Sequence, residues 1–230
     1  DDITQQTYKP GKLTIATGQP AYGPWVMNDK PESGEGYEAA VAYAVADKLG
    51  FKKSDVVWTR TAFDTAIAPG AKDWDFNIQQ FGITDERKKA VDFSSSYYND
   101  SQSVVVKKDS KFANATKVSD LKDATVGVMV GTLAYDYAKA NIKDDIQTFN
   151  DDAALAQALD AGQIDALVTS TVECVYMVQS EQVKDAKVLG RLPDSEDKSG
   201  MGIVLPKDSK LTAAVTKAVD DLNDDGTIKK

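Results

Sequence analysis

The sequence predicts an α/β protein built as two lobes of related plan. Short segments rich in β-branched residues alternate with segments of helical periodicity along the chain. One pattern occurs twice: a glycine that ends a helix, two intervening residues, an aspartate and an apolar strand, at 70–74 and at 162–166. A chain of 230 residues with 42% hydrophobic residues is long enough for two small cores. We expect lobe 1 to comprise 1–104 with 193–230, and lobe 2 to comprise 105–192.

Lobe 1 is expected to begin with a β-branched strand that Gly18 and Pro20 end. A helix follows, because apolar residues recur at helical spacing and Gly50 is a stop signal. Pro69 and Gly70 end a second, short helix. The expected elements are strands at 13–17, 76–80 and 201–205 and helices at 38–49, 63–68 and 211–222.

Lobe 2 is expected to repeat this alternation. Asn150 is predicted to cap a helix whose first turn holds Asp151 and Asp152, since carboxylates are favourable at the positive end of a helix dipole. Gly162 ends that helix. The other expected elements are strands at 126–130 and 164–168, a helix at 133–141, and two strands that cross between the lobes, 102–108 and 188–192.

The composition excludes several classes of function. The net charge is −9, so we expect no binding to nucleic acid or to an anionic lipid surface. There is no histidine, which removes Ser-His and Cys-His nucleophile pairs and histidine metal sites. Cys174 is the only cysteine, which removes internal disulfides and cysteine-based zinc sites and fits either a reducing cytoplasm or an exported bacterial protein. We expect neither a metal nor a cofactor, and no apolar run approaches the ~20 residues that span a bilayer.

The stretch from Thr84 to Phe93 is the most informative part of the sequence. Thr84 is predicted to cap a helix whose first turn carries Asp85 and Glu86. Arg87 lies near the same positive helix end, where basic residues are disfavoured, so its presence there points to a bound anion. A guanidinium binds a carboxylate bidentately. The alternative interpretation is a surface ion pair.

Other candidate features also have ordinary structural interpretations. Gly131-Thr132 either offers N–H and hydroxyl groups to an anion or forms a common strand-to-helix turn. Cys174 is expected to be a buried, unreactive thiol, because no histidine is present to activate it. The aspartates within 220–225 fit a solvated helix end better than a calcium loop, since the closing glutamate is missing. Tyr22 lies in a loop rich in Gly and Pro, whereas the other early aromatic residues are expected to fill the core: Trp25, Phe63, Trp74 and Phe81.

The segment 81–94, followed by Tyr97-Tyr98, resembles the signature of the polar-amino-acid family of bacterial extracellular solute-binding proteins, the substrate-capture subunits of ABC importers. Three further segments resemble the family's aromatic loop (22–25), its second-lobe anion loop (130–132) and its last lobe-two strand (162–166). The resemblance covers nearly the whole chain. It implies the two-lobed fold of type II periplasmic binding proteins, in which two hinge strands join the lobes and the lobes close on a ligand.

The resemblance also implies roles for particular residues. Arg87 matches the arginine that holds the α-carboxylate of the ligand, and Thr132 matches its partner in lobe 2. Tyr22 and Phe63 match aromatic walls along the ligand side chain, and Gln19 matches a position that reads that side chain. The remaining expected ligand-binding residues are Gln80, Phe81, Gly82, Leu133 and Ser170.

Three of these positions depart from the family pattern. Gly82 stands where a hydroxyl is usual, Leu133 where a second hydroxyl often follows Thr132, and Ser170 where the family has the aspartate that pairs with the α-ammonium. A serine supplies no countercharge for a buried ammonium. The sequence therefore predicts weak binding of zwitterionic amino acids and better binding of carboxylates that lack the ammonium.

The leading hypothesis is a solute-binding protein, not an enzyme, that captures an amino acid or a related small carboxylate for the membrane subunits of an ABC importer. We expect a monomer in the periplasm or outside the cell, with a tether through a removed N-terminal segment as one form of anchoring. The first alternative is a dehydratase-like enzyme on the same scaffold that acts on a cyclic carboxylate, with Glu173 as the acid. The second alternative is the sensor domain of a signalling protein.

Overall fold

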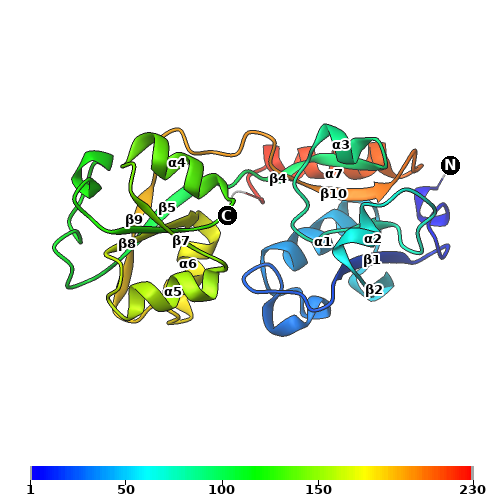
Figure 1. The fold of residues 1–230 in the computed structure, drawn as a ribbon. Coiled ribbons are helices and arrows are strands. Elements are labelled where there is room, and N and C mark those ends of the chain that lie inside the picture. Colours follow the sequence, from blue (N-terminus) through cyan, green and yellow to red (C-terminus); the bar gives the residue numbers. More distant parts are fainter. Residues whose placement is uncertain (1, 229–230) are drawn as a thin grey trace. The chain divides into compact units, whose positions relative to one another are not determined.

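The protein, described here as a computed structural model, consists of two compact units. Unit 1 is Asp1–Asn99 with Lys198–Lys230, and unit 2 is Asp100–Asp197. The structure describes residues 2–228. The colours of Figure 1 show that the chain forms most of unit 1, then all of unit 2, and returns to unit 1 with its last strand and helix.

Unit 1 is built on a five-stranded sheet that is parallel at one side and antiparallel at the other. Its strands in spatial order are β2 (Val56–Thr61), β1 (Leu13–Gly18), β3 (Phe76–Asn77), β10 (Met201–Pro206) and β4 (Val91–Tyr98). β1, β2 and β3 are parallel, and β10 runs antiparallel to both of its neighbours. The helices of this unit are α1 (Tyr37–Lys48), α2 (Phe63–Ala66), α3 (Asp85–Lys88) and α7 (Thr212–Asp224), with 3-10 turns at Ile3–Gln5, Met27–Asp29, Pro31–Ser33 and Lys53–Asp55.

Unit 2 repeats the same sheet order. Its strands in spatial order are β7 (Ile146–Phe149), β6 (Val126–Met129), β8 (Ala166–Ser170), β5 (Gln102–Lys107) and β9 (Ala186–Arg191). β6, β7 and β8 are parallel, and β5 is antiparallel to β8 and β9. In both sheets three parallel strands are followed by one strand that is antiparallel to them, and the fifth strand is antiparallel to that fourth strand. This shared order confirms the prediction of two related α/β lobes. The helices are α4 (Leu133–Asn141), α5 (Asp152–Asp160) and α6 (Thr171–Gln179), with a 3-10 turn at Val118–Leu121.

One aspartate performs the same structural role in each unit. The N–H of Asp75 donates to the carbonyl of Thr14 (2.8 Å), and the N–H of Thr14 donates back to the Asp75 carboxylate (2.7 Å). Asp165 and Thr125 form the same reciprocal pair, at 2.8 and 2.9 Å. The expected correspondence between Asp73 and Asp165 is therefore wrong by two positions, because Asp75 rather than Asp73 directly precedes its strand.

Helices cover both faces of each sheet. In unit 2, Val104 and Val106 of β5 pack in a cluster with α4, whereas Val105 packs on the opposite face in a cluster with α5 and α6. Alternate residues of a strand point to opposite faces, so the continuous apolar run of β5 suits a strand buried on both sides. In unit 1, the main core joins the sheet to α1 and α7, and a smaller cluster joins the other face to α2.

The connection between the units differs from the expectation. The segments 102–108 and 188–192 do not cross between lobes, because β5 and β9 pair with each other inside the sheet of unit 2. The boundaries fall instead at Asn99/Asp100 and at Asp197/Lys198. The expected lobe ranges placed 100–104 and 193–197 in lobe 1, whereas these residues lie in unit 2, and β10 and α7 rejoin unit 1 as expected.

Some local boundaries also differ. Asp151, not Asn150, caps α5, since its side chain accepts from the N–H of Ala154 at 2.7 Å. The strand expected at 76–80 ends at Asn77, and Gln80 adopts a left-handed conformation with φ 57°. The aromatic residues Trp25, Trp74 and Phe81 are buried, as expected, whereas Tyr22 is 62% exposed.

Candidate functional site

A cavity of about 540 Å³ opens in unit 1 at the carboxyl ends of three parallel strands. β1 ends at Gly18 and β2 at Thr61, and the chain after β3 enters the cavity at Gln79 and Gln80. In α/β sheets, ligands bind outside the carboxyl ends of the parallel strands. The lining consists of residues 17–22, Trp25, Val26, Glu38, residues 61–63, Gln79 and Gln80.

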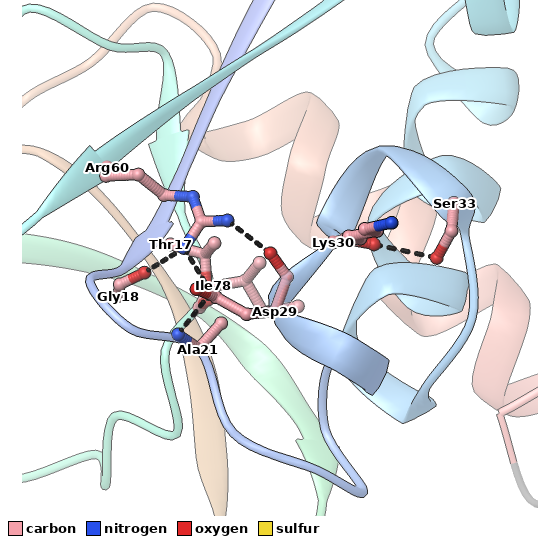
Figure 2. A network of polar contacts seen from close by, with 8 residues as sticks. All are labelled: Thr17, Gly18, Ala21, Asp29, Lys30, Ser33, Arg60 and Ile78. Carbon is pink, nitrogen blue, oxygen red and sulfur yellow. Dashed lines mark hydrogen bonds and ion pairs between the residues drawn. The ribbon is translucent and has the colours of Figure 1, made fainter.

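The loop after β1 forms one side of this cavity and is braced by Arg60 (Figure 2). The Arg60 guanidinium donates to the carbonyl of Gly18 (2.8 Å) at one end of the loop, and to the carboxylate (2.6 Å) and carbonyl (2.7 Å) of Asp29 at the other end. The N–H of Ala21 also donates to the Asp29 carboxylate, at 2.8 Å. These contacts hold the pKa of Asp29 below its usual value, with the Ala21 N–H as the main cause and Arg60 as the second. The braced loop carries the predicted residues Gln19 and Tyr22.

Arg87 lies in unit 1 beside two stacked aromatic rings. Thr84 caps α3 as predicted, because its hydroxyl accepts from the N–H of Arg87 (3.1 Å). The guanidinium donates to the carbonyl of Gly82 (2.8 Å) and lies 5.3 Å from the ring centroid of Phe63. Phe63 stacks on Phe81 with a centroid distance of 4.8 Å. Unit 1 therefore brings Phe63 together with three predicted site residues of the segment 81–94, namely Phe81, Gly82 and Arg87.

The guanidinium of Arg87 keeps most of its hydrogen-bonding capacity. No carboxylate within the described residues 2–228 forms an ion pair with it, which contradicts the alternative of a surface ion pair. A guanidinium has five N–H donors, and the carbonyl of Gly82 uses only one edge of the group. Phe63, which also lines the cavity, faces this cation. The arrangement suits a carboxylate ligand at the rim of the cavity.

Unit 2 places its predicted residues at one sheet edge. β6 and β8 are parallel neighbours, so Thr132, which follows β6, and Ser170, which ends β8, lie at the carboxyl edge of the same sheet. Thr132 caps α4: its hydroxyl accepts from the N–H of Tyr135 (3.3 Å) and donates to the carbonyl of Met129 (2.7 Å). Ser170 caps α6 by accepting from the N–H of Glu173 (3.3 Å), and Leu133 is 56% exposed.

Three carboxyl groups near Ser170, which we term the unit 2 acidic group, are Asp100, Asp152 and Glu173. Burial, and then the charges of Asp152 and Asp100, raises the pKa of Glu173 to about 7. Burial and the charge of Asp151 raise the pKa of Asp152. One buried carboxylate oxygen of Asp152 has no hydrogen-bond partner in the described part of the chain. We do not assign a metal centre to this group, because the described residues contain no set of three or more His, Cys, Asp and Glu side chains that could hold a metal ion.

The sequence reasoning named Glu173 but missed two other acids of the site region. Asp100 lies two residues before the first residue of β5, Gln102, which pairs with Ser170. Asp152 begins α5 after β7, at the carboxyl edge that also holds Thr132 and Ser170. The order of the parallel strands would have placed Asp152 at this edge, had β7 been recognised. Cys174, next in the chain, is buried, and its burial raises the pKa of the thiol, as expected for an unreactive cysteine.

The sequence reasoning also missed Glu38, a buried acid that lines the cavity of unit 1. Its carboxylate accepts a hydrogen bond from the N–H of Gln80 (2.7 Å) and another from the hydroxyl of Tyr97. Burial raises the pKa of Glu38 to about 7. Only its place in the first turn of a helix could be read from the sequence, and that position gives no sign of its burial.

Two α/β units of the same sheet order, with a ligand-sized cavity at a carboxyl edge, define a bilobed binding protein. A model of the family described as bacterial extracellular solute-binding proteins, family 3, matches residues 13–230. The L-cystine-binding protein TcyJ of Escherichia coli K12 is 30% identical over 197 residues, which are 84% of this chain and 71% of that protein. The L-arginine-binding protein of Pseudomonas aeruginosa is 28% identical in an alignment that covers 96% of this chain and 86% of that protein. The solved structure of an ancestral cationic amino acid solute-binding protein is 29% identical and has a TM-score of 0.72, covering 96% of this chain and 94% of that one.

The chain therefore belongs to the bacterial extracellular solute-binding proteins, family 3. This confirms the family, the fold class and the general function predicted from the segment 81–94. Among residues 2–228, no helix is both long enough and apolar enough to cross a membrane.

Proposed function

We propose that this protein captures an amino acid and delivers it to the membrane subunits of an ABC importer. The observation that carries the proposal is the guanidinium of Arg87, which lies over Phe63 at the cavity, donates to Gly82 and has no carboxylate partner within residues 2–228. In this proposal Arg87 binds the α-carboxylate together with Thr132. Tyr22 and Phe63 pack along the ligand side chain, and Gln19 hydrogen-bonds to it.

The unit 2 acidic group supplies the negative charge that Ser170 lacks in this proposal. A buried ammonium needs a carboxylate or several acceptors, because its desolvation otherwise costs several kcal/mol. Glu173 lies in the first turn of the helix that Ser170 caps, and its raised pKa reflects burial and the nearby charges of Asp152 and Asp100. A bound cation would stabilise the ionised form of Glu173. We therefore replace the expectation of weak amino-acid binding by the proposal that an amino acid binds with its ammonium near Glu173.

The binding energy is used in this proposal to bring the two units together. Arg87 belongs to unit 1, whereas Thr132 and Glu173 belong to unit 2. A ligand that contacts both units stabilises a closed arrangement, as in other hinge-closing proteins. A fluorophore pair, one in each unit, is expected to report a shorter distance when ligand is added, and an unchanged distance at saturation would contradict closure.

The proposal includes a place of action in the periplasm or outside the cell and a monomeric state. The relatives named above are binding proteins for L-cystine and L-arginine. L-Arginine and L-cystine are therefore the first ligands to test. L-Arginine has a net positive charge at neutral pH, which suits the acidic character of the chain, whose net charge is −9, whereas L-cystine is net neutral.

A thermal-shift panel tests the proposal. The panel contains the standard amino acids, L-cystine and small carboxylates without an ammonium group. We expect at least one amino acid to raise the melting temperature, because a ligand that binds only the native state stabilises it by mass action. If only the simple carboxylates raise it, the ammonium site is absent, and if nothing does, the proposed function is wrong.

The same protein tests the dehydratase alternative. Glu173, with its pKa raised to about 7, is partly protonated at neutral pH, which an acid catalyst also requires. Incubation with prephenate or arogenate is expected to give no aromatic product. Aromatic product that disappears in Glu173→Gln would establish the enzyme instead.

A further inference from the structure

Glu38 is a buried acid whose carboxylate accepts two hydrogen bonds. It lies in the first turn of α1 and is 1% exposed. One of its oxygens, Oε2, accepts from both the N–H of Gln80 and the hydroxyl of Tyr97. No lysine or arginine among residues 2–228 forms an ion pair with it. Burying a carboxyl group without a cation costs free energy of folding, so the groups that Glu38 contacts indicate its role.

The first contact fixes a strained residue on the cavity wall. Gln80 has φ 57°, in the left-handed region that residues other than glycine rarely adopt. It lines the cavity and directly precedes Phe81, which stacks on Phe63. β3 ends at Asn77, so the N–H of Gln80 is outside the strand and is held by Glu38 instead. The hydrogen bond therefore stabilises a backbone conformation that places the cavity residues after β3.

The second contact ties the same oxygen to the end of β4. Tyr97 is buried and lies two residues before Asn99, the last residue of unit 1 before the chain enters unit 2. Tyr37, next to Glu38 in α1, donates its hydroxyl to the carbonyl of Tyr97 at 2.9 Å. Trp25, another cavity residue, packs edge-on against both Tyr37 and Tyr98. Glu38 thus joins the cavity wall to the segment that leads out of unit 1.

We propose that Glu38 is a positioning residue of the binding site: its Oε2 holds the left-handed backbone of Gln80 and thereby sets the cavity wall for the ligand. Only the expected effect of Glu38 on ligand affinity rests on the proposed function. The positioning itself is a property of unit 1 and can be measured without a ligand.

Three substitutions separate positioning from simple packing. Glu38→Gln keeps a carbonyl-type oxygen that accepts from both donors, because both donate to the same oxygen of Glu38. Glu38→Leu removes the acceptor. Val45→Ala, in the same helix and also buried, is the matched control that weakens the same core without touching Gln80.

Amide hydrogen exchange of the full chain, followed by NMR without ligand, is the first measurement. We expect the Gln80 amide to exchange at a similar rate in the wild type and in Glu38→Gln, and at least about 10-fold faster in Glu38→Leu than in the Val45→Ala control. Equal Gln80 protection in Glu38→Leu and Val45→Ala would overturn the proposal. Rapid exchange in Glu38→Gln would overturn it as well.

Gln80→Gly provides a second test, because glycine adopts a left-handed conformation without help. Glu38→Leu is expected to lower the melting temperature less in the Gln80→Gly background than in the wild-type background. If Glu38→Leu alone does not fold, the double variant is expected to fold. A double variant that is no better than Glu38→Leu alone would show that Glu38 does not act through Gln80.

Calorimetric titration with L-arginine measures the consequence for binding. We expect at least about 10-fold weaker affinity for Glu38→Leu and near wild-type affinity for Glu38→Gln and Val45→Ala. Wild-type affinity in Glu38→Leu would overturn the proposed effect on the site. If the wild type binds no ligand of the thermal-shift panel, the proposed function fails, whereas the exchange and melting measurements still decide the role of Glu38.

Discussion

At the scale of the residue, Arg87 carries most of the proposed ligand recognition. Arg87→Ala is expected to weaken amino-acid binding by about 2–5 kcal/mol, the range for a buried, hydrogen-bonded charge pair that loses one partner. Arg87→Lys keeps the charge but loses the planar fork, so an intermediate affinity is expected. Calorimetry measures both, with Arg191→Ala as the control, because Arg191 is an exposed arginine at the end of β9. Unchanged affinity in Arg87→Ala would remove Arg87 from the site.

Glu173 is expected to make binding depend on pH. Burial and the neighbouring acids raise the pKa of its carboxyl to about 7, so it takes up a proton as the pH falls below 7. A proton and a bound ammonium compete for this carboxylate, so affinity is expected to be about 10-fold weaker at pH 6 than at pH 8. Titrations of the wild type, Glu173→Gln and the exposed control Glu181→Gln measure the effect. The loss of affinity of about 10-fold between pH 8 and pH 6 should be absent in Glu173→Gln and present in Glu181→Gln. An equal loss in Glu173→Gln would contradict the role of Glu173.

Several residues of the proposed site could be named from the sequence because they lie within short segments of characteristic sequence. The stretch 81–94 contains Arg87, Phe81 and Gly82, which the structure brings together with Phe63. Glu38 and Asp152 were missed as site residues because their roles depend on burial and on strands that lie far away in the chain. Charge and helical position alone would place either side chain on an ordinary helix end.

At the scale of the element, the reciprocal aspartate pairs decide the start of the central strands. Asp75→Ala leaves the N–H groups of Thr14 and Tyr8 without their acceptor, and Thr14 is buried. An unsatisfied buried donor costs about 1–3 kcal/mol, so unfolding by denaturant should show a loss of this size. Asp73→Ala, two residues earlier and exposed, is expected to change stability by less than about 0.5 kcal/mol. Equal losses of stability in Asp75→Ala and Asp73→Ala would contradict the role of Asp75 in the pair with Thr14.

Elements with strong periodicity or clear stop signals could be predicted, and others could not. The helices around 38–49 and 211–222 correspond to α1 and α7, which have regular buried stripes. β4 was not expected as a strand because aspartate, three serines and two tyrosines dominate its sequence, and only its pairing with β10 explains it. β5 was misread as a crossing segment, since an apolar run of that length suits either a connection or a central strand buried on both faces.

At the scale of the whole molecule, buried acids make the stability of the native protein depend on pH. The pKa values of Glu38 and Glu173 are raised from 4.5 to about 7, so the native state binds protons more tightly than the unfolded chain. Their contribution is fully present below pH 4.5 and is lost as the pH rises through 7, at about 1.4 kcal/mol for each pKa unit of a fully buried group. Glu173 is less buried than Glu38 and contributes less.

Denaturant unfolding between pH 5 and pH 8, without ligand, measures this dependence. The wild type is expected to lose stability over this range relative to Glu38→Gln, which has no titratable group at that position. Glu173→Gln should show a smaller change in the same direction. A wild-type profile identical to that of Glu38→Gln would mean that Glu38 titrates normally in the native protein.

The two units follow one plan, and the proposed ligand connects them by its two charged groups. In the proposal, Arg87 of unit 1 binds the carboxylate and the unit 2 acidic group binds the ammonium. The sequence predicted a carboxylate site at Arg87, which the proposal keeps. It also predicted from Ser170 that the ammonium site is lost, whereas the proposal assigns the ammonium to acids from three separate segments of the chain, whose proximity the sequence does not reveal.

The most direct test is calorimetric titration of the wild-type protein with L-arginine, with its decarboxylated analogue and with its deaminated analogue. L-Arginine is expected to bind, and each analogue, which lacks one of the two charged groups, is expected to bind at least about 100-fold more weakly. An analogue that binds as tightly as L-arginine would contradict the recognition of the group that it lacks.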